Sequence, residues 1–205
     1  MTVCGKENHL HKAANGRGRG MWCGLLRLTQ YHKEVRMAQS VLDNKRILAV
    51  DDEPDVLEVL KEEIMAAAPN CHFETATTFD QATELLSSWS YDLLILDIMG
   101  VRGFDLLQNA AVRPYPIPTV MLTAHAFSPD ALKKSIELGA RAYLPKDRLG
   151  AIVPFLEDVL SYEYGPAWKR LLKDIEGVFS KEWGPYWRKP NDAFWAEFEA
   201  KIAEK

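Results

Sequence analysis

Short apolar runs alternate with segments of helical periodicity between residues 46 and 162. The apolar runs have the length of strands, and residues typical of helix ends, such as Pro54, Ser128 and Gly139, flank the periodic segments. The pattern predicts strands over 46–50, 72–77, 91–97, 118–124 and 140–146. It predicts helices over 53–68, 77–89, 103–112, 128–139 and 148–162.

Most of these strands are apolar runs, whereas 72–77 alternates in the manner of a strand, and a helix follows each of the five. Such strands are typical of a parallel sheet that helices cover on both faces, so the sequence predicts an α/β fold with a doubly wound five-stranded parallel sheet. We expect Thr77 or Thr78 to cap the second helix and Pro154 to bend the last one. Ligands of such sheets bind at the carboxyl ends of the strands.

Polar residues stand at four of these carboxyl ends: Asp51 and Asp52, Asp97, Thr123 and Lys146. Clustered carboxylates repel one another and need protons or a cation, and a hard ion such as Mg²⁺ suits them. Asp97 then becomes a candidate nucleophile for a phosphoryl group, with Lys146 and Thr123 as partners of the phosphoryl oxygens. A single aspartate at a strand end is more often a cap or turn residue. The joint pattern therefore carries the prediction.

The segments "ILAVDDEPDVLEVL", "LLILDIM", "VMLTA" and "AYLPK" resemble the response-regulator receiver domain of two-component signal transduction. The resemblance covers roughly residues 44–162 and implies a flavodoxin-like sheet with strand order 2-1-3-4-5. It implies that Asp97 is the phosphoacceptor and that Asp52 binds Mg²⁺ directly. Asp51 would hold a metal-bound water, and the backbone carbonyl of Met99 would complete the protein ligands.

The same resemblance makes Thr123 and Tyr143 a switch pair. In the family, the hydroxyl group moves toward the phosphoryl group and the aromatic ring turns inward. An aromatic residue in a strand is more often simply core. The position of Tyr143 three residues before Lys146 favours the switch interpretation.

The sequence departs from the family pattern in three places. The loop after Asp97, "IMGVRGF" (98–104), is about two residues short and has no proline, so we expect metal affinity and kinase recognition to differ from the family pattern. Lys146 is followed by Asp147 instead of proline, and the Leu144–Pro145 peptide need not be cis. Met99 and His125 stand where an attacking water would be activated, and neither is a carboxamide or carboxylate, which predicts a long-lived phosphoryl group.

Composition separates three regions in the 205 residues. Residues 1–46 carry nine Lys and Arg against three Asp and Glu, residues 47–162 carry eight against eighteen, and residues 163–205 carry eight of each. We expect a basic, disordered extension over 1–43, a receiver domain over 44–162 and a helical tail over 163–205. Nucleic acid or anionic lipid is the alternative explanation of the basic arm, and residues 1–36 could be an over-extended gene start before Met37.

No segment has the length and apolarity of a membrane span, and the apolar stretch 21–28 contains Arg27 and lacks a cleavage site. Three scattered cysteines suit a reducing compartment, so we expect a cytoplasmic protein. His9 and His11 lack partners at metal-ligand spacing, which argues against a zinc site.

Four of the six tryptophans lie in the tail, where helices are expected over 167–183 and 191–205, the second capped by Asn191 or Asp192. So short a segment cannot hide these rings alone. Packing on the receiver's own helices is favoured over a homodimer or another protein. The tail is net neutral and shows no helix-turn-helix with a basic recognition helix, so no DNA binding is expected.

Two classes of function remain. The first is a Mg²⁺-dependent signalling switch, which receives a phosphoryl group from a sensor histidine kinase or histidine phosphotransfer protein and acts on a downstream protein. The second is a pseudo-receiver, a binding module that works without phosphate. Retention of Asp51, Asp52, Asp97, Thr123 and Lys146 favours the first. In neither class is a separate catalytic output domain expected, since no kinase, phosphodiesterase or cyclase motif is present.

Overall fold

The computed structural model describes residues 40–124, 128–162 and 164–203, which belong to one compact unit. Their sheet has the five strands β1 (Arg46–Val50), β2 (His72–Ala76), β3 (Leu93–Asp97), β4 (Thr119–Thr123) and β5 (Ala142–Pro145). All pairings are parallel and the order is β2-β1-β3-β4-β5. The predicted fold class and strand order are confirmed.

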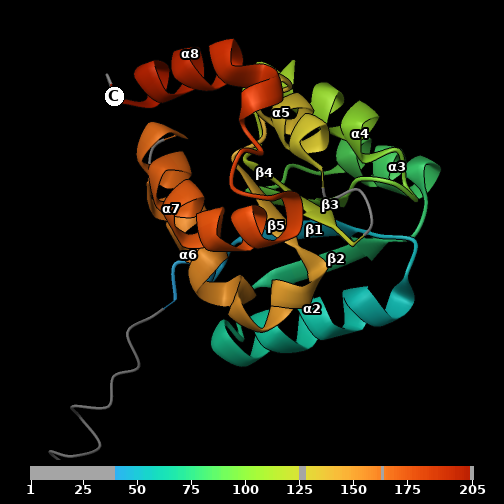
Figure 1. Cartoon of the computed structure of the whole chain (residues 1–205). Coiled ribbons are helices and arrows are strands. Elements are labelled where there is room, and N and C mark those ends of the chain that lie inside the picture. The colour runs from blue at the N-terminus through green and yellow to red at the C-terminus, as the bar shows by residue number, and fades with distance from the viewer. Residues whose placement is uncertain (1–39, 125–127, 163, 204–205) are drawn as a thin grey trace, which may run out of the picture. The chain divides into compact units, whose positions relative to one another are not determined.

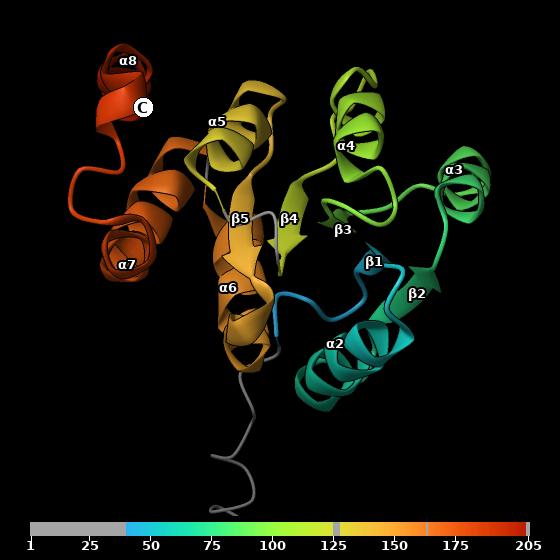
Figure 2. The same cartoon turned by 45° about the vertical axis from the view of Figure 1, so that its right-hand side comes forward.

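Five helices follow the five strands: α2 (Pro54–Ala67), α3 (Phe79–Ser88), α4 (Gly103–Ala111), α5 (Pro129–Glu137) and α6 (Ile152–Ser161). Helices α2 and α6 lie on one face of the sheet, and α3, α4 and α5 lie on the other (Figures 1 and 2). Both faces are therefore covered, which is why β3 and β4 are buried at every position.

Two of the expected caps are present. The Thr78 hydroxyl accepts a hydrogen bond from the Gln81 N–H, so Thr78 and not Thr77 caps α3, and the Ser128 hydroxyl accepts one from the Ala131 N–H. The helix predicted over 148–162 begins later than predicted. Residues Lys146–Ala151 form the 3-10 helix η1, and Pro154 lies in the first turn of α6. Because a first-turn N–H has no partner within the helix, Pro154 breaks no hydrogen bond there.

The described chain begins before the first strand. Leu42, assigned from sequence to the extension, is fully buried in the core, and the Ser40 hydroxyl donates to Glu157 Oε1 at 2.7 Å. The fold therefore includes residues 40–43. Residues 1–39, with His9 and His11, lie outside the described residues.

The tail forms α7 (Tyr164–Trp183), the 3-10 helix η2 (Lys189–Asn191) and α8 (Asp192–Ala203). Helix α7 lies along β5 and α6, and α8 lies beside α5 (Figures 1 and 2). Although β5 is at the edge of the sheet, all its residues are buried, because α7 covers that edge. The Trp168 indole is fully buried and its N–H donates to the Ala140 carbonyl at 3.1 Å.

Aromatic rings join the two tail helices to each other. Trp168 of α7 packs edge to face on Phe198 of α8 with ring centroids 5.6 Å apart. Trp187, between the helices, packs on Phe179 of α7 at 5.2 Å and on Trp195 of α8 at 5.0 Å. Arg188 lies over the Trp187 ring and forms an ion pair with Glu199 of α8, so a charged contact also holds α8 in place. The tail thus buries its aromatic face against itself and the receiver, as the sequence favoured.

Asn191, one of the two predicted caps, directly precedes α8, and its side chain contacts α5. Its side-chain oxygen accepts a hydrogen bond from Lys133 at 3.2 Å, and its amide nitrogen donates to Asp130 at 3.2 Å. Asn191 therefore links the start of α8 to α5. No helix of the described residues is long and apolar enough to cross a membrane.

Candidate functional site

The register of the sheet brings two carboxylates side by side. Val50 of β1 pairs with Leu96 of β3, so Asp51 and Asp97, the next residues of each strand, are level at the carboxyl edge. Only 1% of Asp51 and 4% of Asp97 is exposed. Burying two charges so close together requires a compensating cation.

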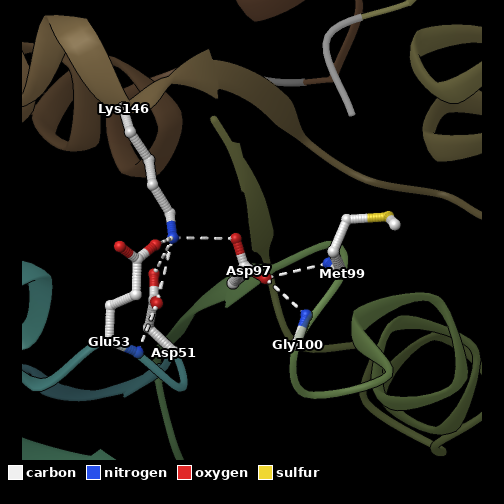
Figure 3. A network of polar contacts seen from close by, with 6 residues as sticks. All are labelled: Asp51, Glu53, Asp97, Met99, Gly100 and Lys146. Atoms are coloured by element: carbon white, nitrogen blue, oxygen red, sulfur yellow. Dashed lines mark hydrogen bonds and ion pairs between the residues drawn. The ribbon is translucent and has the colours of Figure 1, made fainter. Parts of the chain in front are cut away.

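Lys146 provides that cation in the structure. It follows β5, and its Nζ lies 2.8 Å from Asp51 Oδ2 and 3.0 Å from Asp97 Oδ1 (Figure 3). The lysine side chain is only 10% exposed. Burial alone would lower the pKa of Lys146, but its hydrogen bonds to the carboxylates outweigh burial and raise that pKa, so the ammonium form is retained. Burial raises the pKa of Asp51, an effect that Lys146 and the Glu53 N–H partly oppose.

The loop after β3 orients the Asp97 carboxylate. The backbone N–H groups of Met99 and Gly100 donate to Asp97 Oδ2 at 2.8 and 2.9 Å (Figure 3). Oδ1 thereby faces Lys146, while Oδ2 is held by the loop. Gly103 allows this short loop to close, since a Cβ there would lie 1.9 Å from the Asp97 backbone oxygen.

Asp52 is exposed and lies against the loop. A Cβ on Gly100 would lie 1.8 Å from Asp52 Oδ1, so only glycine leaves room for the carboxylate in this position. Asp52 is therefore at the same edge as Asp51 and Asp97. It is on the loop side of the pocket, whereas Lys146 approaches Asp97 through Oδ1.

Among the described residues, no group of three or more His, Cys, Asp or Glu side chains has metal-binding geometry. The chemistry of the donors still suits a hard cation, because they are carboxylate oxygens. Asp51 Oδ2 is buried and accepts no hydrogen bond in the described part of the chain, its contact with Lys146 being an ion pair.

Thr123 and Tyr143 lie on the neighbouring strands β4 and β5. Both side chains are buried, with the Tyr143 ring turned inward and fully covered. Burial raises the pKa of the Tyr143 phenol, and the Thr123 hydroxyl and the Ser128 backbone beside it act in the opposite direction. The two predicted switch residues are thus neighbours, and the backbone of Ser128, at the start of α5, lies beside Tyr143.

The structure describes only one of the two residues expected to flank an attacking water. Met99 is 70% exposed, and its side chain points away from Asp97 (Figure 3). His125 lies outside the described residues. No cis peptide bond occurs in the described residues, so the Leu144–Pro145 peptide is trans, as the departure from the family pattern allowed.

Glu53 belongs to the site although the sequence did not single it out. Its Oε1 lies 2.7 Å from Lys146 Nζ, and its N–H donates to Asp51 Oδ1 at 3.0 Å (Figure 3). The available signal was its position, directly after an acidic pair and before Pro54. That position equally predicts the start of a helix. The sequence pattern does not show which residue a long exposed side chain such as that of Glu53 contacts.

Residues 47–153 match the family model of the response regulator receiver domain, which is about half of the chain. The chain therefore belongs to the response regulator receiver family.

Curated relatives agree over the same segment. The transcriptional regulatory protein CpxR of Escherichia coli (strain K12) is 38% identical over 103 residues, which are 49% of this chain and 42% of that protein. The response regulator protein PilR of Pseudomonas aeruginosa is 32% identical over 107 residues, 51% of this chain and 23% of that protein. The chain thus matches less than half the length of either relative.

Solved receiver structures share the fold. The non-phosphorylated receiver domain of HemR from Leptospira biflexa is 32% identical, with a TM-score of 0.51, covering 58% of this chain and 96% of that one. A putative response regulator from Chloroflexus aurantiacus is 26% identical, with a TM-score of 0.52, covering 58% and 98%.

Proposed function

We propose that this receiver accepts a phosphoryl group on Asp97 and acts as a phosphorylation-controlled signalling switch. The observation that carries the proposal is the convergence of Asp51, Asp97 and Lys146 from three strand ends, with Lys146 Nζ within 3.0 Å of both carboxylates. A buried ammonium beside a carboxylate nucleophile is suited to neutralise the charge of an incoming phosphoryl group.

The contacts of each side chain indicate its role in the transfer. Asp97 Oδ1 is the attacking atom, because Oδ2 accepts the Met99 and Gly100 N–H groups and becomes the carbonyl oxygen of the acyl phosphate. Lys146 then pairs with a phosphoryl oxygen. Thr123, at the end of β4, is the hydroxyl donor for a second phosphoryl oxygen.

Receiver domains generally bind Mg²⁺. In this chain the ligands would be Asp52 and Asp97, the Met99 carbonyl and, through a water, Asp51. The ion would neutralise negative charge that Lys146 alone leaves uncompensated. Asp52 is exposed at the pocket edge, which leaves its carboxylate available to a cation.

The phosphoryl donor is a sensor histidine kinase or a histidine phosphotransfer protein, and the protein is cytoplasmic. We place the output in protein contacts, not in DNA binding or catalysis. The packing of the tail supports this placement, because α7 covers β5, the strand that carries Tyr143 and leads to Lys146. A change at Tyr143 therefore occurs on the strand that helix α7 of the tail contacts. A homodimer is a further possible outcome of such a change.

If Tyr143 and Ser128 move in response to the phosphoryl group, helix α5 connects that movement to the tail. Ser128 begins α5, and α5 carries Asp130 and Lys133, which hold Asn191 of η2. The emission of the tail tryptophans and the sedimentation of the full chain should therefore change on phosphorylation, and they should not change in Asp97→Asn.

The test of the function itself uses a small acyl-phosphate donor with Mg²⁺ and the full chain. A gain of about 80 Da, the mass of one HPO₃ group, that is absent in Asp97→Asn supports the switch. No gain by a folded protein supports the pseudo-receiver, which remains the alternative. The exposed Met99 supplies no base for water, so we expect the label to persist, and its rapid loss from purified protein would contradict that expectation.

A further inference from the structure

Glu53 completes the hydrogen bonding of Lys146. An ammonium group has three N–H bonds to donate. Nζ of Lys146 donates to Asp51 Oδ1 at 3.0 Å and to Glu53 Oε1 at 2.7 Å, and it forms an ion pair with Asp97 Oδ1 at 3.0 Å (Figure 3). The resting ammonium therefore has one carboxylate partner for each donor, and a phosphoryl oxygen on Asp97 must replace one of them.

The three partners differ in how easily they can be replaced. The side chains of Asp51 and Asp97 are 1% and 6% exposed, whereas that of Glu53 is 59% exposed. A buried carboxylate that loses its donor stays unsolvated, which is costly, but an exposed carboxylate is rehydrated at once. Glu53 is thus the partner that Lys146 gives up at least cost.

The backbone fixes where Glu53 stands. Glu53 is the residue before α2, its N–H donates to Asp51 Oδ1 at 3.0 Å, and Pro54 follows at the first helical position. An ordinary exposed ion pair contributes little to stability. The contribution of Glu53 therefore lies in where it holds the ammonium and in the negative charge that it adds at the mouth of the pocket.

We propose that Glu53 restrains phosphoryl transfer by competing for Lys146: it pairs with the Lys146 ammonium at the pocket mouth in the resting protein and is the partner that the incoming phosphoryl oxygen displaces. This inference rests on the proposed function. In the step, Asp97 Oδ1 forms a bond to phosphorus while the bond from phosphorus to the donor's acyl oxygen breaks. The donor's carboxylate leaves with the electron pair, and Lys146 passes from Glu53 to a phosphoryl oxygen without losing its proton.

The probe is acetyl phosphate, with the full chain, saturating Mg²⁺ and intact-mass detection. Glu53→Gln removes the competitor for Lys146 and one negative charge facing an anionic donor. The phosphorylation rate at low donor concentration should rise about three- to tenfold. Because Glu53 competes with the donor for Lys146, the gain should shrink as the donor approaches saturation, which a loss of folding would not produce.

Two further variants separate charge from position. Glu58→Gln removes the same charge from an exposed residue of α2, the helix that Glu53 precedes, and should leave the rate unchanged. Glu53→Asp keeps the charge but shortens the side chain by one methylene, so its rate should lie between those of the natural protein and Glu53→Gln.

The outcomes distinguish the two proposals. If the natural protein gains no phosphoryl group, the proposed function itself fails. If it does gain one and Glu53→Gln reacts at the same rate or more slowly, the role of Glu53 is refuted while the function stands. An equal gain in Glu58→Gln would also refute it, because bulk charge would then explain the effect.

Discussion

Replacing Lys146 by methionine tests how strongly the two buried carboxylates of the pocket depend on the positive charge of Lys146. Methionine keeps an unbranched apolar stem but removes the ammonium that lies within 3.0 Å of both Asp51 and Asp97. Both carboxylates stay buried, so the variant leaves two negative charges side by side without a cation. Breaking a buried ion pair in this way costs about 3–5 kcal/mol of the free energy of unfolding.

The pair of Lys45 and Asp92 offers a matched control. Their side chains are 39% and 41% exposed and their charged atoms are 3.3 Å apart. Because water screens such a pair, Lys45→Met should cost less than about 1 kcal/mol. Adding Asp97→Asn to Lys146→Met removes one of the two stranded charges, and it should restore a large part of the lost stability.

Urea unfolding at pH 7, followed by tryptophan emission with EDTA present, gives the free energies of unfolding. A loss in Lys146→Met no larger than that in Lys45→Met would refute the reasoning, because the buried carboxylates would then not depend on Lys146. Failure of Asp97→Asn to compensate would refute it as well.

Four further variants or measurements test other parts of the structure. Gly103→Ala should cost about 2–4 kcal/mol in urea unfolding, since its Cβ would meet the Asp97 backbone oxygen, which cannot move aside. Gly100→Ala should leave stability nearly unchanged but displace Asp52, so that half-maximal phosphorylation needs about tenfold more Mg²⁺; an unchanged requirement would remove Asp52 from the metal site. Trp168→Phe leaves the buried Ala140 carbonyl without its donor and should cost about 1–3 kcal/mol, and a smaller loss would show that α7 is not held there. Burial raises the pKa of Cys71 from 9.0 to about 11, so the folded thiol stays protonated at pH 9, stability falls as pH rises from 9 to 11, and alkylation of the Cys71 peptide at pH 9 should be at least about tenfold slower than in urea.

The strands and the residues at their ends were predictable because a parallel sheet imposes a strong pattern. Asp97 ends a run of buried residues, and Lys146 directly follows one. Once strands of one direction are level, their carboxyl ends must meet, so residues far apart in the sequence could be brought together without any contact information. The five predicted pocket residues lie at this edge, and their roles remain proposals.

Contacts made by long side chains and by the tail were not predictable in the same way. Glu53 reaches Lys146 across 93 positions of sequence, and Asn191 reaches Lys133 across 58. The amphipathic pattern of the tail shows that an apolar face must be covered, but it does not say by which surface. The late start of α6 was not predicted because the 3-10 helix η1 precedes it directly. A 3-10 turn at the end of an α-helix has an apolar spacing too similar to that of the α-helix to be told apart in the sequence.

The most direct test of the central claim is to locate the phosphoryl group chemically. The full chain is treated with acetyl phosphate and Mg²⁺, the acyl phosphate is trapped with hydroxylamine, and the resulting hydroxamate is mapped by peptide mass spectrometry. The account predicts modification of residue 97, none in Asp97→Asn, and strongly reduced modification in Lys146→Met. Modification at another carboxylate, or none in a folded protein, would contradict it.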